Sequence, residues 1–201
     1  DRIEAGTLLI AGAITQSEIS LKPVFPEHLA SIIAKLKEVG PRVIVEGTDS
    51  VTLIPHPLKA TNFKTLPFPG FPTDMQAQFM ALLSVSKGSS VITETVFENR
   101  LRHIAELQRM GANIRVEGNI AVVQGVPFLS GAPVMATDLR ASAALVLAGL
   151  AAHGKTTIQG LHHLDRGYDN LEGKLRKLGA NLRRIVISCN EESSVERSIQ
   201  I

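Results

Sequence analysis

Three glycines end three similar segments of the chain, at 36–40, 107–111 and 175–179. The glycines are spaced by 71 and then by 68 residues, a period typical of a whole supersecondary unit. Each glycine follows apolar residues at helical spacing, which predicts a helix with one apolar face and a glycine at its C-terminus. An alternating or β-branched run follows each glycine and predicts strands at 42–46, 113–117 and 181–185. The chain is therefore predicted to repeat one α/β unit three times.

More uniformly apolar segments precede these helices, best seen at 75–85 and 141–152. Their many small residues are typical of helices packed on all sides. Further short strands are predicted at 19–21, 51–54, 90–93, 120–123 and 156–158. The sequence thus predicts a single α/β domain over 1–187, with buried helices inside and sheets outside. Its three repeats are expected at approximately 1–65, 66–130 and 131–187.

The segment from 188 to 201 is polar and without a clear pattern, so we expect a mobile tail. It contains Cys189, the only cysteine. A single cysteine excludes an internal disulfide and a cysteine-based metal site, and it fits the reducing cytoplasm. No neighbouring residue would lower the pKa of this thiol, so Cys189 is not expected to be a nucleophile.

Composition argues against several other classes of protein. The net charge is only +2, tryptophan is absent and tyrosine occurs once, so nucleic-acid binding is not expected. No apolar run reaches the length of about 18 residues that a membrane helix needs. His162 and His163 would point to opposite faces of a strand, so we expect them at the surface and predict no metal site. The first residues carry neither an initiator methionine nor a signal-peptide pattern, which suggests a piece of a longer protein.

Two segments, 71–79 and 136–143, each contain an aspartate directly after a threonine where a helix is expected to begin. In the first, Thr73 and Gln76 have the spacing of a capping box, in which both side chains bind free backbone N–H groups. Acidic residues are also favoured in a first helical turn by the helix dipole. Asp74 and Asp138 therefore have a structural explanation, yet one of them is our candidate general base.

Three arginines occupy corresponding places near the helix starts of the repeats: Arg100, Arg140 and Arg166. If the repeats pack about a common centre, their equivalent loops converge at one edge. Three guanidinium groups there would bind a small, multiply charged anion through paired hydrogen bonds. The alternative is that they are solvated arginines, which pair with the acidic residues Glu98, Asp138 and Asp165.

Five segments together resemble the UDP-N-acetylglucosamine 1-carboxyvinyltransferases, a group of enolpyruvyl transferases, and the resemblance runs from residue 1 to about 185. These segments are Asp1-Arg-Ile-Glu-Ala-Gly6, Phe71-Pro-Thr-Asp-Met-Gln-Ala-Gln-Phe79, Thr93-Glu-Thr-Val-Phe-Glu-Asn-Arg100, Met135-Ala-Thr-Asp-Leu-Arg-Ala-Ser-Ala143 and His163-Leu-Asp-Arg-Gly-Tyr168. The resemblance implies an inside-out α/β, barrel-like domain of three βαβαββ-type repeats. It also implies transfer of the enolpyruvyl group of phosphoenolpyruvate to the 3-hydroxyl of UDP-N-acetylglucosamine, a committed step of peptidoglycan synthesis, with no metal or organic cofactor.

The resemblance further implies roles for individual residues. Asp74 would contact the 3-hydroxyl as general base, and Val96 would contact the sugar nucleotide. The arginines 100, 140 and 166 would line the phosphoenolpyruvate pocket. Asp138 would orient these arginines or relay a proton, and Asp138 and Leu139 match residues that shift with the bound ligand.

This chain departs from the family pattern in its extent. The resemblance implies a second, N-terminal domain with a reactive cysteine on a mobile loop, and Cys189 does not match that cysteine. It also implies that the first strand and helix of the present domain are missing. We therefore expect the chain alone to be inactive. Two alternatives stay open: a domain of the shikimate-pathway enolpyruvyl transferase, and a non-catalytic repeat domain that only binds.

Overall fold

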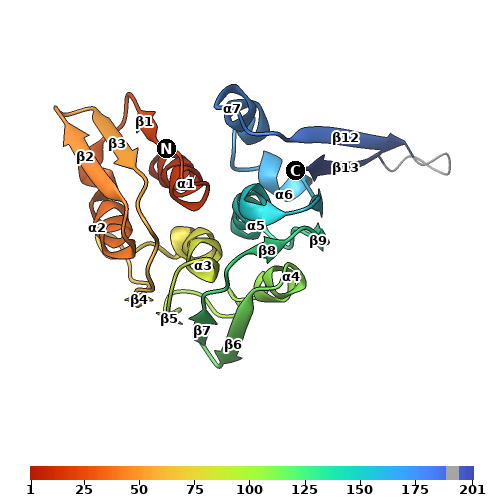
Figure 1. Ribbon diagram of the computed structural model, residues 1–201, viewed down its shortest axis with the longest axis horizontal. Helices are drawn as coiled ribbons and strands as arrows, with labels where there is room; N and C mark the ends of the chain where they lie inside the picture. Colours follow the sequence, from red (N-terminus) through yellow and green to blue (C-terminus); the bar gives the residue numbers. More distant parts are fainter. Residues whose placement is uncertain (189–194) are drawn as a thin grey trace.

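The computed structural model of the protein describes residues 1–188 and 195–201. Three buried helices lie next to one another at the centre of the molecule (Figure 1). They are α1 (Arg2–Ile14), α3 (Gln76–Ser84) and α5 (Leu139–Ala151). Gly6 lets α1 lie close to the residue that precedes α3, since a Cβ atom added to Gly6 would lie 2.9 Å from Cε of Met75. All nine residues of α3 are buried. The predicted arrangement of buried helices inside and sheets outside is confirmed.

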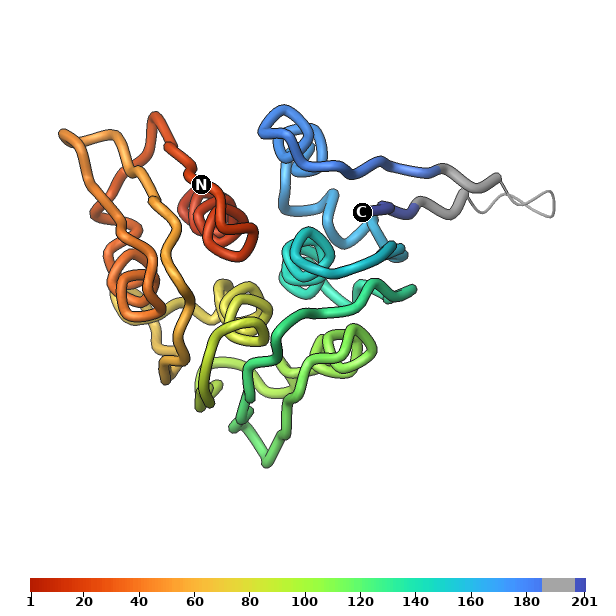
Figure 2. The backbone as a smooth tube through the Cα atoms, viewed as in Figure 1, coloured from red at the N-terminus to blue at the C-terminus, as the bar shows by residue number. Residues whose placement is uncertain are grey.

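Three successive parts of the chain surround this centre, as the order of colours in Figure 2 shows. The first part adds to α1 the elements β1 (Ile19–Leu21), η1 (Pro26–Leu29), α2 (Ala30–Val39), β2 (Arg42–Glu46) and β3 (Ser50–Ile54). The second part adds to α3 the elements β4 (Phe63–Lys64), η2 (Thr73–Met75), β5 (Ser89–Thr93), α4 (Ile104–Arg109), β6 (Asn113–Glu117) and β7 (Ile120–Gln124).

The third part begins after the short strand β8 (Leu129–Ser130), which pairs in parallel with β10 (Ala152–His153), a short strand directly after α5. It adds to α5 the elements β9 (Pro133–Met135), β11 (Thr157–Gln159), α6 (His162–Asp165), α7 (Leu171–Lys177), β12 (Arg183–Ser188) and β13 (Val195–Gln200). Among the described residues, no helix has the length and apolar character needed to cross a membrane.

The second and third outer sheets share one topology. Their strand orders are β4-β5-β7-β6 and β9-β11-β13-β12, with the first pair of each parallel and the other pairs antiparallel. The first sheet, β1-β3-β2, matches them without a counterpart of β4 or β9 in the described part of the chain. A hollow of about 430 Å³ lies beside β1, lined also by residues of α1, α5 and α7. The sequence repeat thus corresponds to a structural repeat, in which the first sheet lacks the strand equivalent to β4 and β9 among the described residues.

The expectation that this domain lacks its first helix is wrong, because α1 takes the central position in the first repeat that α3 and α5 take in the others (Figure 1). Ten of its thirteen residues are buried. Like α3 and α5, α1 is a uniformly apolar segment that precedes an amphipathic helix, which is what the sequence pattern predicts.

The expectation of a mobile tail is wrong for Val195–Gln200, which form β13 between β11 and β12. Ser198 and Ile199 are buried there, and Ile201 exchanges two backbone hydrogen bonds with Thr156. The strand is stabilised by pairing on both sides, which a local polar sequence does not reveal. Cys189 lies outside the described residues.

Two smaller predictions also differ from the structure. The strand expected at 181–185 is β12, which begins two residues later at Arg183. His162 and His163 belong to the short helix α6 and not to a strand, with their ring centroids 4.0 Å apart. His162 is exposed, as expected, whereas His163 is half-buried because the helix turns it partly inward.

Candidate functional site

The central helices run parallel, so their N-termini gather at one end of the molecule. Ile14, Val85 and Ala151, at or beside their C-termini, line one hollow of about 240 Å³ at the opposite end. Asp74 meets Arg140 at the N-terminal end. Converging helix N-termini favour negative charge, because their free N–H groups point outward. The geometry therefore favours an anionic ligand at this end.

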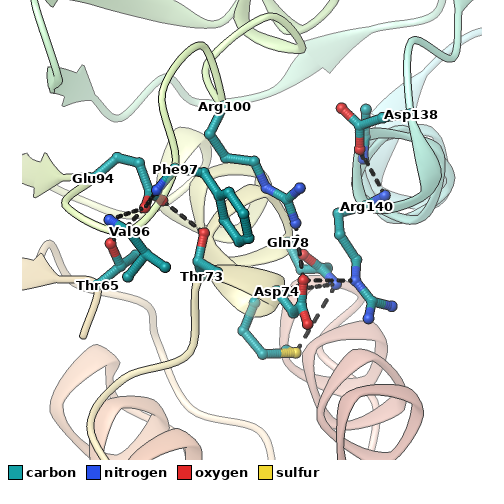
Figure 3. Close-up of polar contacts among 12 residues, drawn as sticks. Thr65, Thr73, Asp74, Gln78, Glu94, Val96, Phe97, Arg100, Asp138 and Arg140 are labelled. Atoms are coloured by element: carbon teal, nitrogen blue, oxygen red, sulfur yellow. Dashed lines mark hydrogen bonds and ion pairs between the residues drawn. The ribbon is translucent and has the colours of Figure 1, made fainter. Parts of the chain in front are cut away.

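Asp74 lies between two arginines in Figure 3. Its Oδ1 accepts a hydrogen bond from Nη2 of Arg100 at 2.9 Å and lies 3.2 Å from Nε of Arg140. The side chain of Asp74 is 38% exposed, whereas those of Arg100 and Arg140 are 22% and 14% exposed. Both arginines thus contact the same oxygen, and the carboxylate still reaches solvent.

A buried hydrogen-bond network lies directly beneath this group. The Tyr168 hydroxyl is 3.0 Å from Oγ1 of Thr7 and accepts from Nε2 of Gln78 at 3.2 Å. The same Gln78 amide donates to the backbone carbonyl of Asp74 at 2.9 Å. The guanidinium of Arg140 lies over the Tyr168 ring, 5.9 Å from its centroid. Residues from all three repeats therefore fix the position of Asp74 and Arg140 from below.

The pKa of Arg140 lies above its ordinary value. Burial acts to lower the pKa, but the hydrogen bond from Arg140 to Asp74, together with the charge interactions with Tyr168 and Asp74, outweighs it. Arg140 is thus a fixed cation at this end of the molecule.

Asp138 caps the N-terminus of α5. Its Oδ1 accepts from the backbone N–H groups of Arg140 at 2.8 Å and Ala141 at 3.0 Å. Nearby, His103 is fully buried, and its Nε2 has no hydrogen-bond partner in the described residues. Burial lowers the pKa of His103 to about 4, although the charge of Asp138 acts to raise it. Asp138 therefore fixes the start of the helix that carries Arg140.

Glu94 holds the segment that contains Val96. This carboxylate is 2% exposed and accepts hydrogen bonds from the backbone N–H groups of Val96 at 2.9 Å and Phe97 at 3.2 Å. The side chain of Val96 is at the surface, with 37% of the residue exposed. Val96 lies on the same side of α3 as Thr73, and Thr73 directly precedes Asp74 in the sequence (Figure 3).

Arg166 lies beside this group and not within it. It is exposed at the end of α6 and lines a hollow of about 640 Å³ together with Tyr168 and Arg184. Leu139 connects the group around Asp74 with the hollow that Arg166 lines, because its side chain packs directly against Gly167. A Cβ atom added to Gly167 would lie 2.5 Å from Cδ1 of Leu139. The start of α5 therefore packs against the segment that carries Arg166.

The predicted capping box is wrong. Thr73 Oγ1 donates to Oε2 of Glu94 at 2.9 Å, and neither Gln76 nor Thr73 caps the helix with its side chain. Gln76 is fully buried, and both polar atoms of its amide have no partner within the described residues. The long-range bond to Glu94 competes with the local cap and replaces it.

The alternative explanation, in which solvated arginines pair with Glu98, Asp138 and Asp165, names partners that differ from those in the structure. Arg100 and Arg140 pair with Asp74 and not with Glu98 or with the carboxylate of Asp138 in the part of the chain described. Asp165 binds Arg184 at 2.7 and 3.0 Å.

Within residues 1–188 and 195–201, no group of three or more His, Cys, Asp and Glu side chains is placed to hold a metal ion.

Sequence reasoning missed Glu94, Gln78 and Tyr168 as parts of this site. Tyr168 carried a signal, because it is the only tyrosine and follows Arg166 by two residues. Gln78 belongs to the same segment as Asp74, on the next turn of the helix. Glu94 lies in one of the segments that carry the family resemblance, but its place after a predicted strand is also typical of a solvated carboxylate.

Comparison with known proteins adds an independent line of evidence. The sequence model of the EPSP synthase (3-phosphoshikimate 1-carboxyvinyltransferase) family matches residues 1–175. A relative in Synechocystis sp., named UDP-N-acetylglucosamine 1-carboxyvinyltransferase, is 74% identical over 185 residues, which are 92% of this chain and 42% of that protein. A relative of the same name in Myxococcus xanthus is 56% identical over 184 residues, 92% of this chain and 44% of that protein. The chain thus spans less than half the length of these curated relatives.

Solved structures show the same fold. The enolpyruvyl transferase NikO from Streptomyces tendae matches with a TM-score of 0.81 and 34% identity, over 90% of this chain and 43% of that one. EPSP synthase from Acinetobacter baumannii matches with a TM-score of 0.68 over all of this chain and 45% of that one. Its identity is only 18%, so this likeness supports the fold alone.

Proposed function

The chain belongs to the EPSP synthase family of enolpyruvyl transferases, and on that premise we propose that it is one domain of a UDP-N-acetylglucosamine 1-carboxyvinyltransferase. The names of relatives 55–74% identical to it support this choice of acceptor. The complete enzyme would transfer the enolpyruvyl group of phosphoenolpyruvate to the 3-hydroxyl of UDP-N-acetylglucosamine and release phosphate. This reaction would serve peptidoglycan synthesis in the cytoplasm.

One observation carries the assignment of the chemistry to this domain: the contact of Asp74 with Arg100 and Arg140 at the converging helix N-termini. In the proposed reaction, Asp74 accepts the proton of the 3-hydroxyl as that oxygen bonds to the substituted vinyl carbon of phosphoenolpyruvate. A carboxylate can do this only within about 3 Å of the hydroxyl. Its exposed fraction gives a hydroxyl access.

The arginines bind the anionic substrate in this proposal. Arg100 and Arg140 would exchange Asp74 for the carboxylate and phosphate of phosphoenolpyruvate, and Arg166 would reach the same anion from the neighbouring hollow. Their fixed positive charge stabilises the tetrahedral adduct and the leaving phosphate. Val96 and Leu139 would contact the substrates at the edges of this group, and Asp138 would keep Arg140 oriented through the start of α5.

The second half of the site would come from the N-terminal domain of the same enzyme. The methylene carbon of phosphoenolpyruvate must gain a proton when the adduct forms and lose one when phosphate leaves. In this proposal the other domain supplies that proton, so the isolated chain releases no phosphate. No metal or organic cofactor takes part.

A chimera tests the proposal directly. The matching 42% of the Synechocystis relative would be replaced by this chain, which is 74% identical to it. Phosphate release that requires both UDP-N-acetylglucosamine and phosphoenolpyruvate is the expected result. The isolated chain, folded by circular dichroism, is expected to release none.

Two outcomes would overturn the proposal. A chimera that releases phosphate only with 3-phosphoshikimate as acceptor would identify the shikimate-pathway enzyme. A folded chimera that binds UDP-N-acetylglucosamine without turnover would favour the non-catalytic binding domain.

A further inference from the structure

Glu94 is a buried carboxylate outside the group of residues assigned to the substrates. It is 2% exposed, and among the described residues it forms no ion pair. Four donors reach it: Oε1 accepts from Thr65 Oγ1 at 2.8 Å, from Val96 N at 2.9 Å and from Phe97 N at 3.2 Å, while Oε2 accepts from Thr73 Oγ1 at 2.9 Å (Figure 3). A buried carboxylate needs such donors, because losing them leaves an unpaired charge away from water.

These donors come from three separate segments of the second repeat. Thr65 follows β4, Thr73 begins η2, and Val96 and Phe97 lie in the loop after β5. Two of the three segments carry residues of the proposed site, because Thr73 precedes Asp74 and the loop contains Val96. Glu94 is therefore the point at which the general base and the sugar-nucleotide contact are joined.

The main chain of Glu94 is itself fixed. Its N–H donates to the carbonyl of Asn119 at 2.9 Å, and its carbonyl accepts from Nδ2 of Asn119 at 2.8 Å. Thr65 is fixed in turn, since its Oγ1 accepts from Thr95 N at 2.9 Å. The carboxylate thus has a rigid base in the sheet and turn behind it, and its rotation would break all four contacts together.

We propose that Glu94 is a positioning residue, which holds Asp74 through Thr73 and the Val96 segment through two backbone N–H groups in the arrangement that the acceptor substrate needs. The inference rests on the proposed function for its kinetic consequences. Its structural content, that one carboxylate fixes two substrate-contacting segments, does not depend on turnover. The two oxygens separate these roles, because Oε2 serves Thr73 while Oε1 serves the loop.

Thr73→Val tests the Oε2 side. Valine keeps the branched shape but cannot donate to Glu94, so Asp74 loses one restraint while the loop keeps both of its bonds. In the chimera, kcat is expected to fall roughly tenfold, since small displacements of a catalytic group are costly. The KM for UDP-N-acetylglucosamine should change little.

The chain offers a matched control. Thr61 Oγ1 donates to Oε2 of Glu38 at 2.8 Å, the same kind of Thr–Glu hydrogen bond away from the site. Thr61 and Thr73 are both half-buried. Thr61→Val should leave kcat and KM as in the unsubstituted chimera. Equal kinetics for Thr61→Val and Thr73→Val would overturn the role of the Oε2 contact.

Substitutions of Glu94 test the Oε1 side. Glu94→Gln keeps a carbonyl acceptor for the loop, and its amide can donate to the Thr73 hydroxyl, so it should retain most activity. Glu94→Leu removes both acceptor oxygens, and with them all four hydrogen bonds, and should lower kcat and raise the KM for UDP-N-acetylglucosamine, each by about tenfold or more. Equal kinetics for these two variants would contradict the proposal.

Amide hydrogen exchange supplies a readout that needs no activity. In Glu94→Gln the N–H groups of Val96 and Phe97 should stay protected, and in Glu94→Leu they should exchange faster, while those of β6 and β7 stay protected. If the unsubstituted chimera has no activity, the proposed function fails, but exchange at these two amides still decides whether Glu94 holds the loop. Unchanged exchange in Glu94→Leu would overturn the inference. If Glu94→Leu does not fold, Thr73→Val and Glu94→Gln still decide it.

Discussion

Asp74 and Arg140 belong to different repeats, and they meet across 3.2 Å between Oδ1 and Nε. Arg100 reaches the same oxygen from the loop before α4. Two cations on one carboxylate oxygen are electrostatically favourable, but they also engage the groups that an anionic substrate would need. An incoming phosphate or carboxylate must therefore compete with Asp74 for the guanidinium groups, and the predictions below follow from this arrangement.

Replacing the carboxylate of Asp74 by an amide should remove the proposed base. In the chimera, Asp74→Asn is expected to lower kcat for phosphate release by about 10²- to 10⁴-fold, the range typical of general-base catalysis. Asp49→Asn is the control, because Asp49 is an aspartate away from this group whose side chain is 47% exposed and paired with Lys22 at 3.6 Å. An Asp74→Asn variant as active as Asp49→Asn would exclude Asp74 as the base.

Arg140 should not tolerate exchange for lysine. Lysine keeps the charge but loses the planar group that contacts Asp74 and lies over Tyr168. Arg140→Lys is expected to raise the KM for phosphoenolpyruvate by about tenfold or more, as for lost charge-assisted hydrogen bonds. Arg109→Lys provides the comparison, since Arg109 is largely exposed and pairs with Glu106 on the same helix. Similar KM values for both variants would argue against an anion-binding role for Arg140.

His103 should make folding stability depend on pH. Its pKa is about 4 in the folded protein and 6.5 when exposed, mainly because burial disfavours the charged ring. Between these pH values the unfolded chain binds more protons, so the free energy of unfolding rises as pH increases from 4 to 6.5 and levels off above. The full effect is about 3 kcal/mol.

Urea unfolding of the isolated chain between pH 4 and 8 measures this effect. His103→Gln should flatten the dependence, whereas His56→Gln, which removes an exposed imidazole, should retain it. An identical pH profile for the two variants would show that His103 is not the group responsible.

Gly125 should be sensitive to any added side chain. A Cβ atom there would lie 1.6 Å from the backbone oxygen of Ser86, and main chain cannot move aside as a flexible side chain can. Gly125→Ala is expected to destabilise the fold by about 3 kcal/mol or more. Gly118→Ala is the control: it has open space but a φ of 60°, so it should cost only about 1 kcal/mol. Denaturant unfolding distinguishes them, and equal losses would contradict the steric argument.

Much of the fold could be predicted because the repeat and the local patterns agree. The strands Arg42–Glu46 and Asn113–Glu117 begin and end where the alternation does. The central helices α3 and α5 followed from runs of small apolar residues. The strand β13 could not be found this way, since its stability comes from hydrogen bonds to β11 and β12 and not from its own composition.

The candidate site was predictable where it depends on the repeat. Arg100 and Arg140 meet at Asp74, as expected from loops that converge, whereas Arg166, which was expected with them, lies beside this group. The role of Thr73 was not predictable, because two hydrogen-bond partners compete for its hydroxyl and the one that wins, Glu94, is 21 residues away. Local motifs describe the cap that a threonine can make and carry no information on such distant partners.

The parallel packing of α1, α3 and α5 also has a consequence for the order of folding. Contacts between residues far apart in sequence form slowly, because the intervening chain must first be closed. The pair Asp74 and Arg140 can form only after the second and third repeats have docked, and the Thr7–Tyr168 contact only after the first and third have done so. A partly folded molecule would hold every one of these residues and still lack the assembled group, so this group would appear as the last event of folding.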